Sequence, residues 1–153
     1  MTTFVKWFLF NAVAFTTLFL FEQKGAISSI VANDLSHISI LIMVLYVFVS
    51  AYVGRLCYLA DQAKVEKDRE DLLKRMDVGW FAAEHFFSLG LLGTVLGLTI
   101  ATQTSLNDTV TVSEIVAGLK VGLNTSFNTT ICGIVFSIPL QIQLMILKYE
   151  LDK

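Results

Sequence analysis

Residues 90–103, which read GLLGTVLGLTIATQ, are apolar enough for a membrane helix, yet they include three glycines and three threonines. Glycine weakens a helix interior by roughly 1 kcal/mol relative to alanine, and a threonine hydroxyl finds no hydrogen-bond partner in lipid. On a helix, the small residues of this stretch fall on one arc of about 100°, opposite the large apolar residues. They are Gly90, Gly93, Thr94, Gly97 and Ala101. The arc predicts a membrane helix with one face suited to close contact.

Residues 115–143 repeat this pattern on a second apolar segment. The small and hydroxyl-bearing residues there fall on an arc of about 120°. They are Gly118, Gly122, Ser126, Thr129, Thr130, Gly133 and Ser137. Small residues four positions apart let two helix backbones approach closely in a membrane. We therefore expect the glycines of the two segments to form a helix-packing surface.

Glycine accounts for close contact but not for the many hydroxyl and amide side chains on the same two segments. A single threonine usually bonds to a carbonyl of its own helix or to a neighbouring helix. As a group, such side chains can line a water-filled path through the membrane without introducing charge. Residues 86–107 and 121–147 contain no Asp, Glu, Lys, Arg or His. If the chain conducts protons, the intramembrane carboxylate that usually carries them must come from another chain.

The whole chain has the composition of an integral membrane protein. Of its 153 residues, 55% are hydrophobic and 16% are charged, and most of the charges lie in one block. The sequence predicts an all-α single membrane domain, 1–153, because four segments have about the length of a membrane span. These segments are about 4–21, 35–54, 80–102 and 115–147. The first could instead be a signal peptide, but no small-x-small site follows its apolar part directly, so we expect a retained span.

The distribution of lysine and arginine predicts the orientation, because cytoplasmic loops carry an excess of these residues. Nine of them lie in the termini and the connection 55–79, whereas the other side has Lys24 and Lys120. We therefore expect a multi-pass protein of the inner (cytoplasmic) membrane with both termini in the cytoplasm. The connection 55–79 alternates acidic and basic residues and lacks proline and glycine over most of its length, which predicts a helix. Its charges indicate a solvated face, with a binding site as the alternative.

Several classes of function are disfavoured by the residues. No nucleophile–base pair, metal-ligand cluster or phosphate-binding loop is evident, so we expect no enzyme, no metal and no cofactor. No basic patch suggests nucleic acid, and the formal net charge is −2. Glu84 and His85 lie near the start of the third span. They are candidates for a proton exit, because histidine titrates near neutral pH, or for interfacial polar residues.

Two motifs together resemble the MotA/TolQ/ExbB proton-channel family. The first is LGLLGTVLGL, residues 89–98, in which Gly97 follows Thr94 at the family's spacing. The second is GLNTSFNTTICGIVFSIP, residues 122–139, which holds the family's threonine, glycine and Ile-Pro pattern. That second pattern is carried by Thr130, Gly133, Ile138 and Pro139. The resemblance covers roughly residues 80–148.

The resemblance implies a homopentamer whose last two spans line a central pore. Two copies of a single-span partner of the MotB/TolR/ExbD type pass through such a pore, and each partner helix carries an aspartate. Proton passage past that aspartate drives rotation of the pentamer around the partner dimer. The pore threonines of the family correspond to Thr94 and Thr130, with Ser126 and Thr129 as further members of the expected proton pathway. The partner aspartate would supply the carboxylate that the two segments lack.

The chain also departs from the family. Four spans resemble MotA, whereas TolQ and ExbB have three, and the large cytoplasmic domain of MotA is replaced here by about 25 residues. The load that this motor would drive therefore stays open, as does sodium as the coupling ion. Two alternatives remain at this stage: a membrane scaffold without transport, and a holin-like pore that conducts without a partner.

Overall fold

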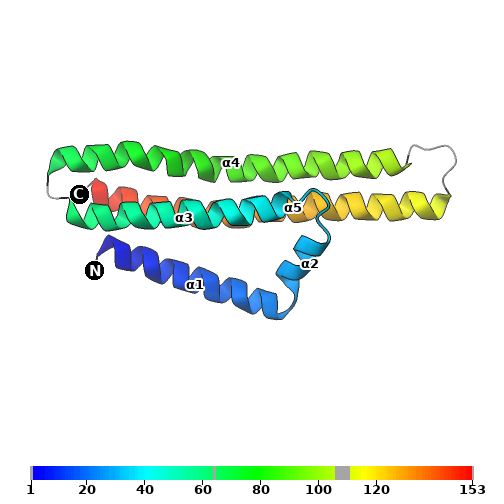
Figure 1. Cartoon of the computed structure of the whole chain (residues 1–153), viewed down its shortest axis with the longest axis horizontal. Helices are drawn as coiled ribbons and strands as arrows, with labels where there is room; N and C mark the ends of the chain where they lie inside the picture. The colour runs from blue at the N-terminus through cyan, green and yellow to red at the C-terminus, as the bar shows by residue number, and fades with distance from the viewer. Residues whose placement is uncertain (1, 64, 106–110, 153) are drawn as a thin grey trace.

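The computed structural model describes residues 2–63, 65–105 and 111–152, which form five helices (Figure 1). They are α1 (Thr3–Gln23), α2 (Ala26–Ala32), α3 (Ile38–Gln62), α4 (Glu66–Ser105) and α5 (Val112–Leu151). Helices α4 and α5 lie side by side along their lengths, α3 packs against both, and α1 lies outside them. All helices except α2 are long and apolar enough to cross a membrane. The protein is therefore an all-α membrane protein with four candidate spans.

The last two helices are much longer than a membrane span requires. Each has 40 residues, which corresponds to about 60 Å at 1.5 Å per residue, about twice the thickness of the hydrocarbon core. The predicted fourth segment is one continuous helix although it contains Pro139. Its first turn is fixed by a capping box, in which Glu114 N donates to Thr111 Oγ1 and Thr111 N donates to Glu114 Oε2.

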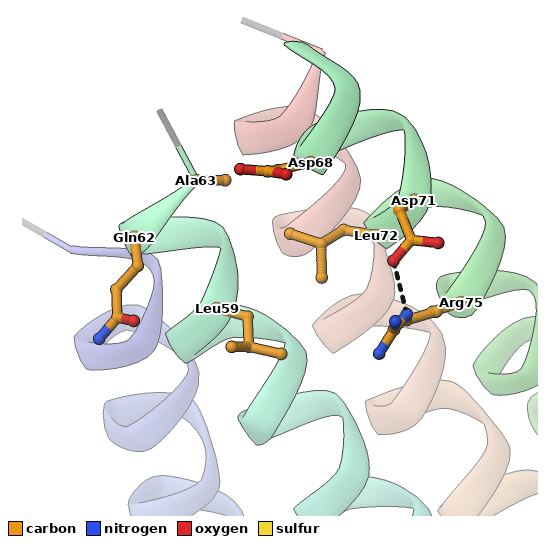
Figure 2. A pocket seen from close by; sticks show the side chains of 7 residues that line it. All are labelled: Leu59, Gln62, Ala63, Asp68, Asp71, Leu72 and Arg75. Carbon is orange, nitrogen blue, oxygen red and sulfur yellow. Dashed lines mark ion pairs between the residues drawn. The ribbon is translucent and has the colours of Figure 1, made fainter. Parts of the chain in front are cut away.

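The charged connection predicted over 55–79 is divided between two antiparallel helices. The backbone leaves α3 at Ala63 in an extended conformation (ψ 110°), and α4 begins at Glu66. Figure 2 shows the hollow of about 380 Å³ between these two helix ends. On its wall, Arg75 Nε lies 2.8 Å from Asp71 Oδ2, one turn away on α4, and both side chains are more than half exposed. We call this end of the bundle, where both chain termini also lie, the charged end (Figure 1).

The short helix α2 lies in a segment that the sequence presented only as a connection. Gly25 makes the turn from α1 with a left-handed backbone (φ 69°), which glycine adopts without a steric penalty. After α2, the buried Asp34 carboxylate accepts hydrogen bonds from Ser36 N at 2.9 Å and Ser39 N at 2.8 Å, so it caps the start of α3. Burial raises the pKa of Asp34, but the hydrogen bonds from Ser36 and Ser39 outweigh burial and hold this pKa below its ordinary value.

An uncharged polar cluster joins α1 to α3 and α5 within the apolar layer. Gln143 on α5 is fully buried; its Oε1 accepts from Trp7 Nε1 at 2.9 Å and from Ser50 Oγ at 3.0 Å. Its Nε2 lies 3.2 Å from Tyr46 Oη and 3.3 Å from Asn11 Oδ1 and donates to both. We call these five residues the Gln143 cluster. Because hydrocarbon offers no alternative partners, the cluster fixes how α1 packs on the other helices.

Replacing Gln143 with leucine is expected to loosen α1. The leucine has a similar volume, but it leaves the Trp7 indole and the Ser50 hydroxyl without their shared acceptor. Bonds of this kind average about 0.6 kcal/mol each between membrane helices, so we expect a loss of roughly 1–3 kcal/mol for the cluster. Thermal unfolding of the purified protein in detergent measures this loss. Gln141→Leu, two residues away and outside the cluster, is the matched control; it loses one hydrogen bond, to Ser137 of its own helix, and is expected to unfold close to the wild-type temperature.

Candidate functional site

The contact between α4 and α5 is made by the predicted small residues. A Cβ atom added at Gly97 would lie 2.6 Å from the carbonyl oxygen of Gly122 and 2.7 Å from Ser126 N. One added at Gly133 would lie 2.8 Å from the carbonyl oxygen of Phe86. These are distances to backbone, which cannot move aside as a side chain can. The two helices therefore approach so closely that glycine is required on both sides of the contact.

Thr94 and Thr130 meet at the edge of this contact, where both side chains are half-buried. Their hydroxyl oxygens are hydrogen-bonded to each other. Thr130 Oγ1 also lies 2.9 Å from Ser126 O, and Thr94 Oγ1 lies 3.2 Å from Gly90 O, so each hydroxyl has a carbonyl acceptor on its own helix. Because each hydroxyl carries one proton, the bond between them can run in either direction. Rotation of the two O–H groups reverses it.

Ser126 and Thr129 lie inside the contact and are almost fully buried, at 2% and 0% exposure. Ser126 Oγ lies 3.0 Å from both Thr94 O and Gly122 O, and it donates to these carbonyls of α4 and α5. Thr129 Oγ1 donates to Thr125 O at 2.9 Å. Both hydroxyls donate to backbone carbonyls at the centre of the contact. The Thr94–Thr130 pair, in contrast, lies at the edge of the contact.

One side of the α4–α5 pair presents a row of exposed and half-buried side chains around the two threonines. We call it the groove face and define it by residues that recur every three or four positions on each helix. They are Glu84, Phe87, Leu91, Thr94 and Leu98 on α4, with Phe127, Thr130, Ile134, Ile138 and Gln141 on α5. Its polar groups are Glu84 and Gln141 toward the charged end and the threonine pair near the middle. Between them the face is apolar.

The two candidates for a proton exit lie on different sides of α4. Glu84 is exposed and lines a hollow of about 490 Å³ together with Ser137 and Gln141 of α5. His85 lies about 100° further round the helix, and its ring stacks on Phe81 with the centroids 3.8 Å apart. His85 Nδ1 lies 2.7 Å from the carbonyl oxygen of Phe81, which can only accept, so this nitrogen carries the proton. Glu84 belongs to the groove face and His85 does not.

Two other predicted site residues lie away from the centre of the α4–α5 contact. Gly118 is half-buried near the start of α5. Pro139 lines an apolar cavity together with residues of α1 and α3, including Phe10 and Tyr46. The structure therefore places Pro139 toward α1 and α3. The other predicted small residues are buried along the contact between α4 and α5; they are Gly90, Gly93, Gly97, Ala101, Gly122 and Gly133.

Gln141 was missed as a site residue by the sequence reasoning. It is half-buried on the groove face, and its Nε2 donates to Ser137 Oγ at 3.1 Å. The signal that could have found it is its spacing, since it lies eleven positions after Thr130 and so on nearly the same side of the helix. A glutamine at that register extends the polar stripe toward the charged end.

Comparison with known proteins identifies the family of the chain. The model of the MotA/TolQ/ExbB proton channel family matches residues 38–153. The match begins at the first residue of α3, so it takes in α3, α4 and α5 and leaves α1 and α2 outside. Neither the curated proteins nor the solved structures gave a match. Because the match spans most of the chain, including both helices of the groove face, this chain belongs to the MotA/TolQ/ExbB proton channel family.

Proposed function

We propose that this protein is the channel-forming subunit of an ion-driven membrane motor and that its groove face lines the channel. Family membership supports a proton-channel component of a motor-type complex. The observation that carries the finer proposal is the Thr94–Thr130 pair, half-buried on a largely apolar face. A pair of mutually bonded hydroxyls can accept a hydrogen bond from a protonated carboxyl group and donate one to a carboxylate.

The residues of the groove face favour an assembly in which protein or water, and not lipid, covers this face. Glu84 lies about one turn inside the apolar part of α4 and is exposed on this face. A carboxylate at such a depth is rarely directed at lipid; it faces a bundle interior or a water-filled cavity. Large apolar side chains such as Phe87 and Phe127 are exposed beside it. We propose five copies arranged with their groove faces inward, enclosing two copies of a single-span MotB/TolR/ExbD-like partner.

In the proposed mechanism, an aspartate on each partner helix carries the proton. When this aspartate is ionised, the Thr94–Thr130 pair donates a hydrogen bond to it; when it is protonated, the pair accepts one. The reversible bond between the two hydroxyls allows this change without a rotation of either helix. Glu84 then receives the proton at the charged end, which we place in the cytoplasm of a bacterial cell because nine of the eleven lysines and arginines of the sequence belong to the termini and the connection 55–79.

Native mass spectrometry of the complex, expressed together with its neighbouring genes, tests the proposed assembly. Five copies with two copies of a single-span protein that carries an intramembrane aspartate are the expected result. Proton flux into proteoliposomes, measured with and without the partner, then separates the functions. Proton flux that requires the partner supports the proposal that this chain is the channel-forming subunit of a motor. Flux from this chain alone would point to a simple pore, and no flux in a complete complex would point to a scaffold.

Exchanging Glu84 for glutamine is expected to slow proton flux, because glutamine keeps the shape but cannot take up a proton. Loss of one positioned proton-transfer group typically reduces a rate by about 100-fold or more, although water in an open channel can replace part of this function. We therefore expect a reduction of roughly tenfold. His85→Gln is the matched control, since its ring stacks on Phe81 away from the groove face. Equal effects of the two substitutions would contradict the assignment of Glu84.

A further inference from the structure

Two adjoining apolar cavities of about 270 and 250 Å³ lie between the later part of helix α1 and the rest of the bundle. Both are lined by Leu18 and Phe21 of α1 and by Val135 and Phe136 of α5. In Figure 1, α1 lies against α3 at the charged end and diverges from it toward α2. The residues that line the two cavities come from these helices and from α5. We call the two cavities together the α1 cleft. Its wall also includes Ile27 of α2 and Met43 of α3.

The cleft widens because the described polar contacts that hold α1 gather at its beginning. The Asp61 carboxylate of α3 accepts from Thr3 N at 2.7 Å and from Phe4 N at 2.9 Å. Lys6 forms an ion pair with Glu150 of α5, and the two α1 residues of the Gln143 cluster, Trp7 and Asn11, follow within the next turn and a half. Further along α1, the hydroxyls of Thr16 and Thr17 bond to carbonyls of their own helix. Glu22, near the end of α1, accepts a hydrogen bond from Ser28 N of α2 at 3.0 Å. Among the described residues, the outer half of α1 therefore makes no hydrogen bond to α3 or α5 and faces them with apolar side chains.

We propose that the α1 cleft binds an acyl chain of a membrane phospholipid. An apolar cavity of about 150 Å³ already stays free of water and takes up a small hydrocarbon, and each half of the cleft is larger. The cleft lies between helices that cross the membrane, where lipid tails are the surrounding solvent. A helix of a second copy does not fit, because a helix with its side chains is about 10–12 Å across. A single hydrocarbon chain fills the cleft lengthwise.

A lysine lies at the turn between α1 and α2, where a lipid phosphate can pair with it, while the nearby Glu22 carboxylate is hydrogen-bonded to Ser28. Lys24 is exposed and follows α1 directly. It lies between Phe21 and Ala26, two residues that line the cleft. A lysine near a membrane surface contributes about 1 kcal/mol toward an anionic lipid. The ligand is therefore a phospholipid whose tail fills the cleft and whose phosphate lies near Lys24, at the end of the cleft opposite the Gln143 cluster.

Retention of lipid by the purified complex tests this proposal independently of any channel activity. The complex is washed extensively in detergent, and its phospholipid is counted per chain by native mass spectrometry. We expect the wild type to retain one phospholipid per chain and Val135→Trp, which fills the cleft, to lose it. Phe48→Trp, on the exposed side of α3 and outside the cleft, is the matched control and is expected to retain the lipid. Lys24→Gln is expected to lower retention several-fold.

A second measurement keeps the test decisive if Val135→Trp fails to fold. Tryptophan placed at Leu18, inside the cleft, or at Phe19, on the exposed face of α1, is reconstituted with phospholipid that carries brominated tails. After dilution into unbrominated lipid, quenching at Leu18→Trp is expected to persist while quenching at Phe19→Trp disappears. Equal and immediate recovery at both positions would overturn the proposal. So would a wild-type complex that retains no phospholipid, which would leave side chains of a neighbouring copy as the occupant.

Discussion

Replacing Thr94 and Thr130 together with valine is expected to abolish ion-driven work while leaving the assembled complex intact. Valine keeps the branched shape of threonine, so the packing at the edge of the α4–α5 contact is preserved. The substitution removes both hydroxyls of the only mutually bonded threonine pair that the described residues place on the groove face. We expect proton flux to fall by roughly 100-fold or more, the range typical of a lost proton-transfer or stabilising group.

The controls for this variant use the same chemical change elsewhere on α4. Thr99 is exposed, and its hydroxyl donates to Val95 O of its own helix at 2.8 Å. Thr99→Val is therefore expected to keep wild-type flux. Thr130→Ser, which retains a hydroxyl, is expected to keep most of the flux that Thr130→Val loses. Native mass spectrometry of each variant checks that the complex still assembles. Wild-type flux from the double valine variant would remove both threonines from the proton pathway.

Periodicity in the sequence located the α4–α5 contact but could not separate its centre from its edge. Gly97 on α4 and Gly122 and Gly133 on α5 lie where the two backbones approach closely, and each belongs to the small-residue arc of its own helix. The arc of about 120° on α5 also holds Ser126, Thr129 and Thr130, and periodicity alone does not distinguish these three; only the family resemblance set Thr130 apart. Only the direction of the neighbouring helix distinguishes a hydroxyl bonded to backbone inside the contact from one that reaches the groove face.

The Gln143 cluster and α2 could not be predicted from the sequence, for a different reason. Asn11 is one polar residue in the first apolar segment, and Gln143 is one in the fourth. Their hydrogen bond connects residues 132 positions apart, so no local pattern relates them. Helix α2 has only seven residues, which is too short for a reliable period of 3.6. Both features depend on how α1 folds back against α3 and α5.

Adding a methyl group at the α4–α5 contact is expected to destabilise the protein strongly. In Gly97→Ala the new Cβ would lie 2.6 Å from the carbonyl oxygen of Gly122, well inside van der Waals contact, so the helices must separate along their longest shared surface. Overpacking of this kind costs roughly 1–3 kcal/mol, which outweighs the gain of about 1 kcal/mol in helix propensity. Unfolding of the purified complex in detergent, followed by circular dichroism, measures the difference.

Gly79→Ala is the matched control, because it makes the same change on the same helix against a movable neighbour. Its new Cβ would lie 2.7 Å from Leu144 Cδ2, the far end of a flexible side chain, so it is expected to be neutral or slightly stabilising. If Gly79→Ala and Gly97→Ala were equally stable, the α4–α5 contact at Gly97 would not be a close approach of two backbones.

The double variant Gly97→Ala/Gly122→Ala extends this test to the geometry of the contact itself. Each new methyl group meets the backbone opposite, and a Cβ at Gly122 would contact the carbonyl oxygen of Gly97 and lie 2.8 Å from Ala101 N. Once one methyl has pushed the helices apart, the second enters space that has already opened. We therefore expect the double variant to lose less stability than the sum of the single variants, by roughly 0.5–3 kcal/mol. If the stability losses of the two single variants simply added up in the double variant, Gly97 and Gly122 would not belong to the same close approach of the helices.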